Sequence, residues 1–481
     1  MNIKNLKTKY RNMPEPVKAS FWYTICNILN KGIALFSMPV FTRILTENEY
    51  GTFTIFQSWY SIIIIFTSLN VFLNSYSKGL LLYKYDRNGF TSSQLSLTTT
   101  ITLIFAVVYI LCIDFWTKLL GLSPVLMVAM FAELLTMPAL EFWSARERFD
   151  YKYKKYVAVT LLMSILSISC GVVAVLNMDY KAEARVYSDA FAKAIFSGVF
   201  FITIMIKGRT FFNKEYWKYA LTFNLPLIPH YLSNYVLSQS DRLMIGYMAG
   251  KSQAAFYSVS YTISTMMLLI VSAINNSLIP YIYKAVDLEE RKNIKKVTRP
   301  LIILVAFLCI ITMVFAPEII LIFAGSKYAD AVYIIPPVAG SVFYIFVYSL
   351  FSHIEYFYKK TGFISVATCI SAIVNFIMNF IFIKLYGYYA AGYTTLVCYI
   401  CLSLLHYVFY KKALKQNGQF EELYDIKLVV ITSALLMAIM LLMVFIYGFP
   451  IARYGIIVVI CIILFVKSRT LGSILKNLKN P

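Results

Sequence analysis

The segment at residues 156–177, YVAVTLLMSILSISCGVVAVLN, contains no charged side chain. A transmembrane helix needs about 20 mostly apolar residues to cross the hydrocarbon core of a bilayer, and this segment has that length. The ten residues before it carry five basic side chains, at Arg146, Arg148, Lys152, Lys154 and Lys155. Because basic residues accumulate in cytoplasmic connections, the sequence predicts a membrane-spanning helix that begins on the cytoplasmic side.

The whole chain repeats this pattern. Of its 481 residues, 60% are hydrophobic and 14% are charged, whereas a soluble domain carries about 25% charged residues to wet its surface. We therefore expect an all-α polytopic membrane protein with about 14 transmembrane helices. The expected helices cover residues 17–41, 50–77, 94–114, 123–143, 156–177, 187–206, 218–239, 253–280, 298–316, 331–354, 363–383, 388–410, 427–447 and 452–467.

The basic residues determine the expected orientation. Counted over alternate connections, 32 Lys and Arg residues fall on one side of the predicted membrane and nine on the other. The positive-inside rule assigns the richer side to the cytoplasm. Both termini are then cytoplasmic, which requires an even number of spans. We expect a multi-pass protein of the bacterial cytoplasmic (inner) membrane.

In a soluble protein, a net charge of +21 would suggest nucleic acid as a binding partner. Here the basic residues lie in short segments between apolar runs, so we expect membrane lipids as partners and no nucleic acid. The three histidines lie on different predicted helices, which predicts no metal site, and we expect no cofactor. A transporter without an ATP-binding motif must use the cargo gradient or an ion gradient, of H⁺ or Na⁺.

Two similar halves are also expected, because internal repeats are common in transporters. The first and seventh predicted helices end near Arg43 and Arg242, and each is followed by a short loop with a small residue close to an aromatic one. We expect two pseudo-symmetric six-helix bundles followed by two additional helices. The expected boundaries are an N-terminal bundle at 1–206, a cytoplasmic linker at 207–217, a C-terminal bundle at 218–410 and two further transmembrane helices within 427–467.

Four segments resemble the polysaccharide flippases of the multidrug/oligosaccharidyl-lipid/polysaccharide exporter superfamily, which serve O-antigen, capsule and teichoic acid export. They are LPLIPHYLS at 225–233, SDRLMIG at 240–246, PEIILIFAGSKY at 317–328 and NFIMNFIFIKLYG at 375–387. Their order and spacing agree with that family over nearly the whole chain. Ala255 stands where a glycine is expected, and Lys31 and His230 are individual features of this chain.

The resemblance implies a fold like that of the MATE transporters, with a central cavity and alternating access. It also implies an undecaprenyl-diphosphate-linked oligosaccharide as cargo, carried from the cytoplasmic to the outer leaflet, and a polysaccharide polymerase as a further partner. The alternatives are a MATE-type antiporter for drugs or cations and a membrane glycan polymerase or ligase. An antiporter cavity for cations should be acidic, whereas the deepest charge of the first helix is Lys31.

The first predicted helix carries a polar stripe that we expect to face the cavity. Ser20, Thr24, Asn27 and Lys31 are spaced by 4, 3 and 4 residues, which places them on one helical face. Lys31 lies about halfway along the span, where a charge costs at least about 2.5 kcal/mol. We expect Thr24, Asn27 and Lys31 to contact the substrate. The alternative for Lys31 is a structural pair with Glu133 or Glu141.

A second polar stripe lies on the seventh predicted helix, where His230, Asn234 and Ser238 share one face. His230 and Lys31 each precede an arginine, Arg242 and Arg43, by twelve residues. If the two halves of the chain are repeats, Lys31 and His230 lie at matching depths in the membrane. We expect His230 and Asn234 to contact the substrate. The alternative is a hydrogen-bonded core histidine beside a proline kink.

Ionisable residues on two other predicted helices are candidates for substrate binding and ion coupling. Asp189 and Lys193 stand at i and i+4 with the acid first, the favourable order for a pair within one helix. Lys193 is a substrate-binding candidate, with snorkelling as its alternative. Glu133 and Asp189 are the ion-coupling candidates, and neutralisation of Lys31 is the alternative for Glu133. Arg43, Asp241 and Arg242 are expected at an outer gate.

Overall fold

A computed structural model describes residues 13–288, 290–455 and 458. These residues form helices and connecting turns, without a strand. Eleven of the described helices are long and apolar enough to cross a membrane. Such all-helical structure is required in lipid, because each backbone polar group must find its partner within the segment. The expected all-α polytopic fold is therefore confirmed, and the count of eleven is consistent with the larger predicted number.

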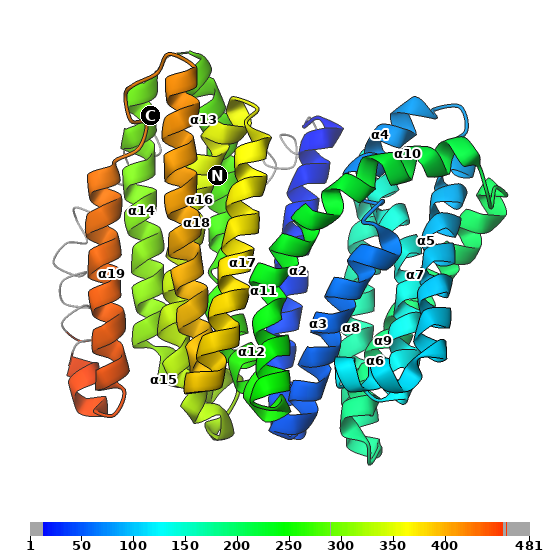
Figure 1. Ribbon diagram of the computed structural model, residues 1–481, viewed down its shortest axis with the longest axis horizontal. Coiled ribbons are helices and arrows are strands. Elements are labelled where there is room, and N and C mark those ends of the chain that lie inside the picture. The colour runs from blue at the N-terminus through cyan, green and yellow to red at the C-terminus, as the bar shows by residue number, and fades with distance from the viewer. Residues whose placement is uncertain (1–12, 289, 456–457, 459–481) are drawn as a thin grey trace, which may run out of the picture. The chain divides into compact units, whose positions relative to one another are not determined.

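The described residues form two compact units, which divide between Ala255 and Phe256. Within each, the long helices run roughly antiparallel to one another (Figure 1). The first unit contains α2 (Glu15–Ile44), α3 (Glu47–Ser68), α4 (Asn74–Leu82), α5 (Arg87–Leu111), α6 (Ile113–Leu120), α7 (Pro124–Phe149), α8 (Tyr153–Asn177), α9 (Lys181–Gly208), α10 (Lys214–Asn224), η1 (Leu225–Leu227) and α11 (Ile228–Met248).

The unit boundary falls inside α12 (Lys251–Thr265). The second unit continues with α13 (Leu268–Asp287), α14 (Arg291–Val314), α15 (Ala316–Phe323), η2 (Ser326–Ile334), α16 (Ile335–Phe357), α17 (Thr361–Tyr386), α18 (Tyr389–Gln416) and α19 (Ile426–Ile446). Most of the predicted fourteenth helix, 452–467, and both chain termini lie outside the described residues. The expected division into six-helix bundles at 207–217 stays a prediction.

The core of the second unit is built around α16, which is buried along most of its length and packs chiefly against α18. In the first unit, α9 packs against α7 and α8, and α3 contacts α7 and α9. By contrast, one side of α17 exposes Ile373, Phe376, Ile377 and Phe380. An exposed apolar surface of this kind fits a lipid environment.

Local signals explain where several helices begin. Thr46 and Glu49 form a reciprocal capping box at the start of α3: the Thr46 N–H donates to Glu49 Oε2 over 2.7 Å, and the Glu49 N–H donates to Thr46 Oγ1 over 3.3 Å. Such a box satisfies two backbone donors that the first turn leaves free. A Cβ at Gly51 would lie 1.9 Å from the carbonyl oxygen of Lys251. Only glycine therefore fits where α3 approaches the start of α12.

Three predicted spans are interrupted. The second span ends at Ser68 and restarts as α4 at Asn74, with Leu69 and Asn70 in the left-handed region at φ 48° and 49°. Non-glycine residues there cost on the order of 1–3 kcal/mol each. The seventh span is broken at η1 beside Pro226, and the eighth between α12 and α13. The sequence predicted the bend at the prolines but not the other two interruptions.

Candidate functional site

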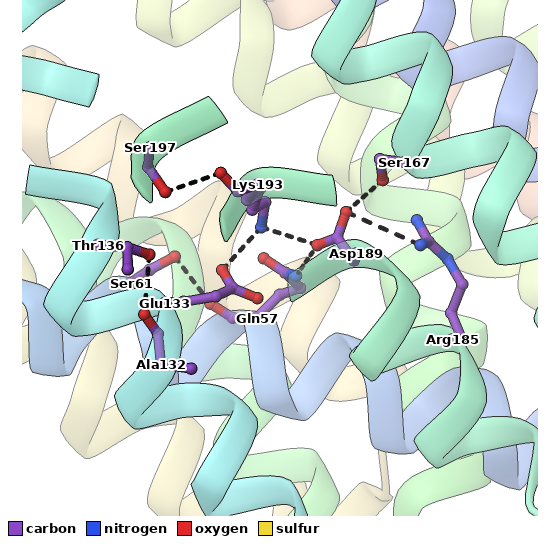
Figure 2. Close-up of polar contacts among 10 residues, drawn as sticks. All are labelled: Gln57, Ser61, Ala132, Glu133, Thr136, Ser167, Arg185, Asp189, Lys193 and Ser197. Carbon is purple, nitrogen blue, oxygen red and sulfur yellow. Dashed lines mark hydrogen bonds and ion pairs between the residues drawn. The ribbon is translucent and has the colours of Figure 1, made fainter. Parts of the chain in front are cut away.

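A buried cluster of charged side chains lies within the first unit, where α3, α7, α8 and α9 meet (Figure 2). Glu133 comes from α7, and α9 contributes Arg185, Asp189 and Lys193 on three successive turns. The carboxylates of Glu133 and Asp189 are almost completely buried. Ionisable groups inside a membrane protein are costly, so such a cluster marks a functional site by default.

Lys193 joins the two acids. Its Nζ lies 2.9 Å from Glu133 Oε2 and 2.7 Å from Asp189 Oδ2, and it sits 5.6 Å from the centre of the Tyr60 ring. The predicted i,i+4 pair of Asp189 and Lys193 is thus present. Glu133 is neutralised by Lys193 and not by Lys31, because α7 and α9 pack side by side.

Polar groups from α3 and α8 complete the environment of Asp189. Gln57 Nε2 donates to Asp189 Oδ2 over 3.0 Å, and the Ser167 hydroxyl donates to Asp189 Oδ1. Asp189, which lies on α9, therefore contacts α3 and α8 as well as its own helix. Removing one member of a buried ion pair costs about 3–5 kcal/mol, because the other charge stays buried. The cluster consequently fixes α3, α8 and α9 against one another while it is fully paired.

Arg185 is the fourth charge of the cluster. In the sequence analysis it counts among the nine basic residues of the outer connections, because the predicted helix begins only at 187. Its guanidinium lies between two rings, 4.1 Å from the centre of Phe41 and 4.5 Å from that of Phe53. Nη1 is 3.8 Å from Asp189 Oδ1, too long for a hydrogen bond. Its Nε and Nη1 atoms are buried and find no hydrogen-bond acceptor among the described residues. The spacing of four residues between positions 185, 189 and 193 was the signal in the sequence that could have identified Arg185 as a member of the cluster.

Two basic and two acidic side chains balance, but Glu133 Oε1 and the Tyr60 hydroxyl are buried without a hydrogen-bond partner in the described part of the chain. A proton or a small cation at Glu133 would weaken its contact with Lys193. Asp189 has Arg185 as a second basic neighbour. No group of three His, Cys, Asp or Glu side chains among the described residues could hold a metal ion.

The polar stripe of α2 is exposed over its whole length, at Ser20, Thr24, Asn27 and Lys31. The Thr24 hydroxyl donates to the Ser20 carbonyl over 2.9 Å. Lys31 forms no ion pair with any described residue, so the structural pair with Glu133 or Glu141 is absent. The structure does not bring Lys31 into the buried cluster.

The polar stripe of α11 forms a ladder of hydrogen bonds. Asn234 Nδ2 lies 3.3 Å from His230 Nε2 and donates to the His230 carbonyl over 3.1 Å. The Ser238 hydroxyl donates to the Asn234 carbonyl, and Arg242 donates to the Ser238 carbonyl over 3.4 Å. Asn234 is exposed, whereas His230 Nδ1 is buried without a hydrogen-bond partner among the described residues. The ladder places His230 and Asn234 on one continuous polar face.

The three residues expected at the outer gate lie in the C-terminal halves of α2 and α11. Arg43, in the last turn of α2, donates to the Pro39 carbonyl over 2.9 Å. Arg242 also donates to Gln239 Oε1, and the same oxygen is 3.4 Å from the Ser58 hydroxyl of α3. Asp241 is buried. Their role as a gate stays a prediction.

Comparison with known proteins identifies the family. Residues 17–286, more than half of the chain, match the family described as polysaccharide biosynthesis protein. A protein of the Lsg locus of Haemophilus influenzae is 23% identical over 74% of this chain and 88% of its own. The "Probable low-salt glycan biosynthesis flippase Agl15" of Haloferax volcanii is 21% identical over 81% of this chain and 82% of its own.

Solved structures share the fold. An inward closed conformation of the lipid II flippase MurJ matches with a TM-score of 0.66 and 15% identity, over 90% of this chain and 99% of that one. An inward-facing multidrug resistance MATE family transporter matches with a TM-score of 0.60 and 12% identity, over 81% of this chain and 94% of that one. These matches show that the chain shares its fold with multi-pass transporters. The chain therefore belongs to the polysaccharide biosynthesis protein family.

Proposed function

We propose that the protein carries an undecaprenyl-diphosphate-linked oligosaccharide from the cytoplasmic to the outer leaflet of a bacterial cytoplasmic membrane, by alternating access. Such a cargo has a polar sugar and a diphosphate that must avoid the hydrocarbon core, while its lipid tail can stay in it. The family and the relatives named as flippases support a glycan cargo. The identity of the lipid carrier rests on the chemistry of the side chains below.

The exposed Lys31 carries the proposal. It lies near the middle of α2, a helix of 30 residues, and forms no ion pair with a described residue. A lysine at this depth is costly unless water or an anion neutralises it. A diphosphate supplies such an anion, and the neighbouring hydroxyl and amide groups of Thr24 and Asn27 can bind sugar or phosphate oxygens. His230 and Asn234 on α11 would add a second set of donors.

The buried cluster supports ion coupling, with H⁺ or Na⁺ as the ion. Glu133 keeps one carboxylate oxygen without a partner among the described residues, and Asp189 has both Lys193 and Arg185 as basic neighbours. An ion bound at Glu133 would break its ion pair with Lys193, and Lys193 would then pair with Asp189 alone. Because Asp189 also holds Gln57 of α3 and Ser167 of α8, a change in its pairing would be transmitted to both helices.

The expected membrane placement belongs to the same proposal. Both termini would be cytoplasmic, since the connections between alternate helices are strongly basic. Delivery to the outer leaflet would supply the glycan to a polysaccharide polymerase, which consumes lipid-linked repeats there. Cysteine accessibility at single sites in α6 and α10 tests this orientation: α10 should be labelled only from the cytoplasm, and α6 only from outside.

The direct test is transport in proteoliposomes. A fluorescent undecaprenyl-diphosphate oligosaccharide is included in the membrane, and the fraction reached by an impermeant quencher is followed over time. The wild-type protein should equilibrate the lipid between leaflets, and Lys31→Ala should not. Lys118→Ala, which removes an exposed lysine of α6, is the matched control and should transport normally. Equal transport by Lys31→Ala and the control would reject the role of Lys31.

The competing function is antiport of drugs or cations, because a multidrug resistance MATE family transporter shares this fold. The exposed lysine on α2 is a specific observation against it here, because a cationic ligand would be repelled. Binding of a cationic dye and of a lipid diphosphate to the same purified protein separates the two. Dye binding that the lipid diphosphate does not displace would favour the antiporter.

A further inference from the structure

The second unit contains a buried acid–base pair that the proposed mechanism does not use. Glu355 lies near the end of α16 and His406 lies on α18. His406 Nδ1 is 2.9 Å from Glu355 Oε1 and 3.1 Å from Oε2. The side chains are 0% and 1% exposed. The ring of Tyr348 stacks on the imidazole, with centres 5.3 Å apart and an interplanar angle of 20°.

No other charged side chain faces the pair among the described residues. Tyr348 and Tyr356 are its titratable neighbours on α16, and His353 of α16 is directed to Asn275 of α13. The remaining charged side chains that are described on the packed elements form no ion pair with Glu355, whose charged neighbour is His406. They are Lys284 and Asp287 on α13, Arg291, Lys295, Lys296 and Arg299 on α14, Lys384 on α17, Lys411, Lys412 and Lys415 on α18, Lys427 on α19, and Lys327 and Asp330 on η2.

The pair is electrically neutral when it holds one titratable proton. Either the imidazole is protonated and donates to the carboxylate, or the carboxyl group donates to a neutral imidazole. Both forms carry the same number of protons and no net charge. A second proton would leave a buried cation, and loss of the proton would leave a buried anion, and either is strongly unfavourable in a dry core. While it stays buried, the pair therefore holds one proton.

The site is not explained by packing alone. A buried ion pair can usually be replaced by apolar side chains of similar volume without loss of stability, and the surrounding core is made of residues such as Leu350, Phe351 and Leu402. Further polar groups lie within two turns before Glu355 on α16. The Ser352 hydroxyl, one turn before Glu355, donates to the Ser349 carbonyl, and the Ser349 hydroxyl donates to Asn275 Oδ1 over 3.2 Å.

We propose that Glu355 and His406 form a proton-binding site of the second unit, which retains one proton in this conformation and exchanges it when the contact between α16 and α18 opens during transport. The proposal rests on the alternating-access function above, and it is separate from the Glu133 cluster of the first unit. Two units would then each carry a protonatable centre.

The test measures cargo-dependent proton movement in proteoliposomes that contain a pH-sensitive dye and the lipid-linked oligosaccharide, with an imposed pH gradient. Glu355→Gln and His406→Gln should each lose this proton flux, and the double variant should be no worse than either alone. Glu422→Gln, which alters an acid at the surface, is the control and should keep it. Wild-type flux in a correctly folded Glu355→Gln protein would overturn the proposal.

A second variant separates proton binding from structure. Glu355→Leu combined with His406→Leu should recover the thermal stability of the wild type, since apolar replacement of a buried pair is tolerated, but it should still lack proton flux. Recovery of the flux would show that the pair is only structural.

A measurement without cargo keeps the two proposals distinguishable. The infrared spectrum of the purified protein minus that of Glu355→Gln should stay constant from about pH 5 to pH 8, the range in which a free imidazole titrates. A pair that titrates in this range is not occluded, and the proposal fails even if the lipid is transported. A constant spectrum in a protein that transports no lipid would reject the proposed cargo but support the occluded site.

Discussion

Asn224 Nδ2 donates a hydrogen bond to the hydroxyl of Ser75 over 2.8 Å, and both side chains are fully buried. Ser75 lies just after the interruption between α3 and α4, and Asn224 ends α10 just before the interruption at η1. The Tyr219 hydroxyl adds a bond to the Ser75 carbonyl over 2.9 Å. These hydrogen bonds join the two interrupted spans at their breaks and hold α4 against α10.

Asn224→Ala should lower stability by about 1–3 kcal/mol, the cost of a buried hydrogen bond whose partner is left unsatisfied. Thermal unfolding of the purified protein measures the change. Asn48→Ala, at an exposed asparagine near the start of α3, should stay within about 0.5 kcal/mol of the wild type. If both variants unfold at the same temperature, the bond does not hold the two breaks together.

Lys193→Ala should destabilise the protein more than Glu133→Gln. The lysine variant leaves two buried carboxylates without their shared cation, at a cost of about 3–5 kcal/mol, while Arg185 remains 3.8 Å from Asp189. The glutamate variant leaves Lys193 paired with Asp189. A double-mutant cycle in thermal unfolding measures the coupling between the two residues. Additive effects would mean that the 2.9 Å contact of Lys193 with Glu133 contributes nothing.

Arg185→Lys should cost about 1–2 kcal/mol although it keeps the positive charge. The planar guanidinium stacks between Phe41 and Phe53, and an ammonium group cannot reproduce that contact. Thermal unfolding in a background that also carries Phe41→Leu and Phe53→Leu is the control. In that background the effect of Arg185→Lys should largely disappear, and an unchanged effect would assign it to Asp189 instead.

Asp425 gives a pH dependence on the acid side. The backbone N–H of Leu428 donates to its carboxylate over 3.1 Å and Arg299 contacts it at 2.6 Å. The bond from Leu428, and next the contact with Arg299, lower the pKa of Asp425 below its usual value. A lowered pKa in the folded state means that the stabilisation is present at neutral pH and is lost as pH falls through the folded pKa.

Asp425→Asn should reduce the loss of thermal stability between about pH 5 and pH 2. Asparagine is also a good N-cap residue, so the start of α19 should survive, and at neutral pH the variant should lose only the stabilisation that the ionised carboxylate adds. Asp425→Ala, which removes the cap as well, should lose about 1 kcal/mol at neutral pH. An acid-side loss that is the same in Asp425→Asn and the wild type would contradict the assignment.

The spans were predictable because apolar length alone specifies them: the segment predicted at 156–177 is observed as Tyr153–Asn177. The pair of Asp189 with Lys193 follows from helical spacing. The bond between Lys193 and Glu133 does not, because 60 residues separate them and only the packing of α7 on α9 brings them together. Arg185 was missed because α9 begins at Lys181, earlier than the predicted 187.

The interruption at Leu69 and Asn70 was also beyond the sequence signals. Glycine and proline are the residues that usually mark a break, and neither occurs between Ser68 and Ser75. The tertiary contacts of Ser75 with α10 stabilise it instead. In the same way, the pair of Glu355 with His406 depends on the close packing of α16 and α18.

The exposed stripe that ends at Lys31 is proposed to bind the anionic head of a lipid-linked glycan. The most direct measurement is the rate at which purified protein in liposomes exposes undecaprenyl-diphosphate oligosaccharide to an external quencher, for the wild type, Lys31→Ala and Lys31→Arg. We predict transport by the wild type, none by Lys31→Ala and partial recovery by Lys31→Arg, which restores the cation. Equal rates in all three proteins would contradict this account.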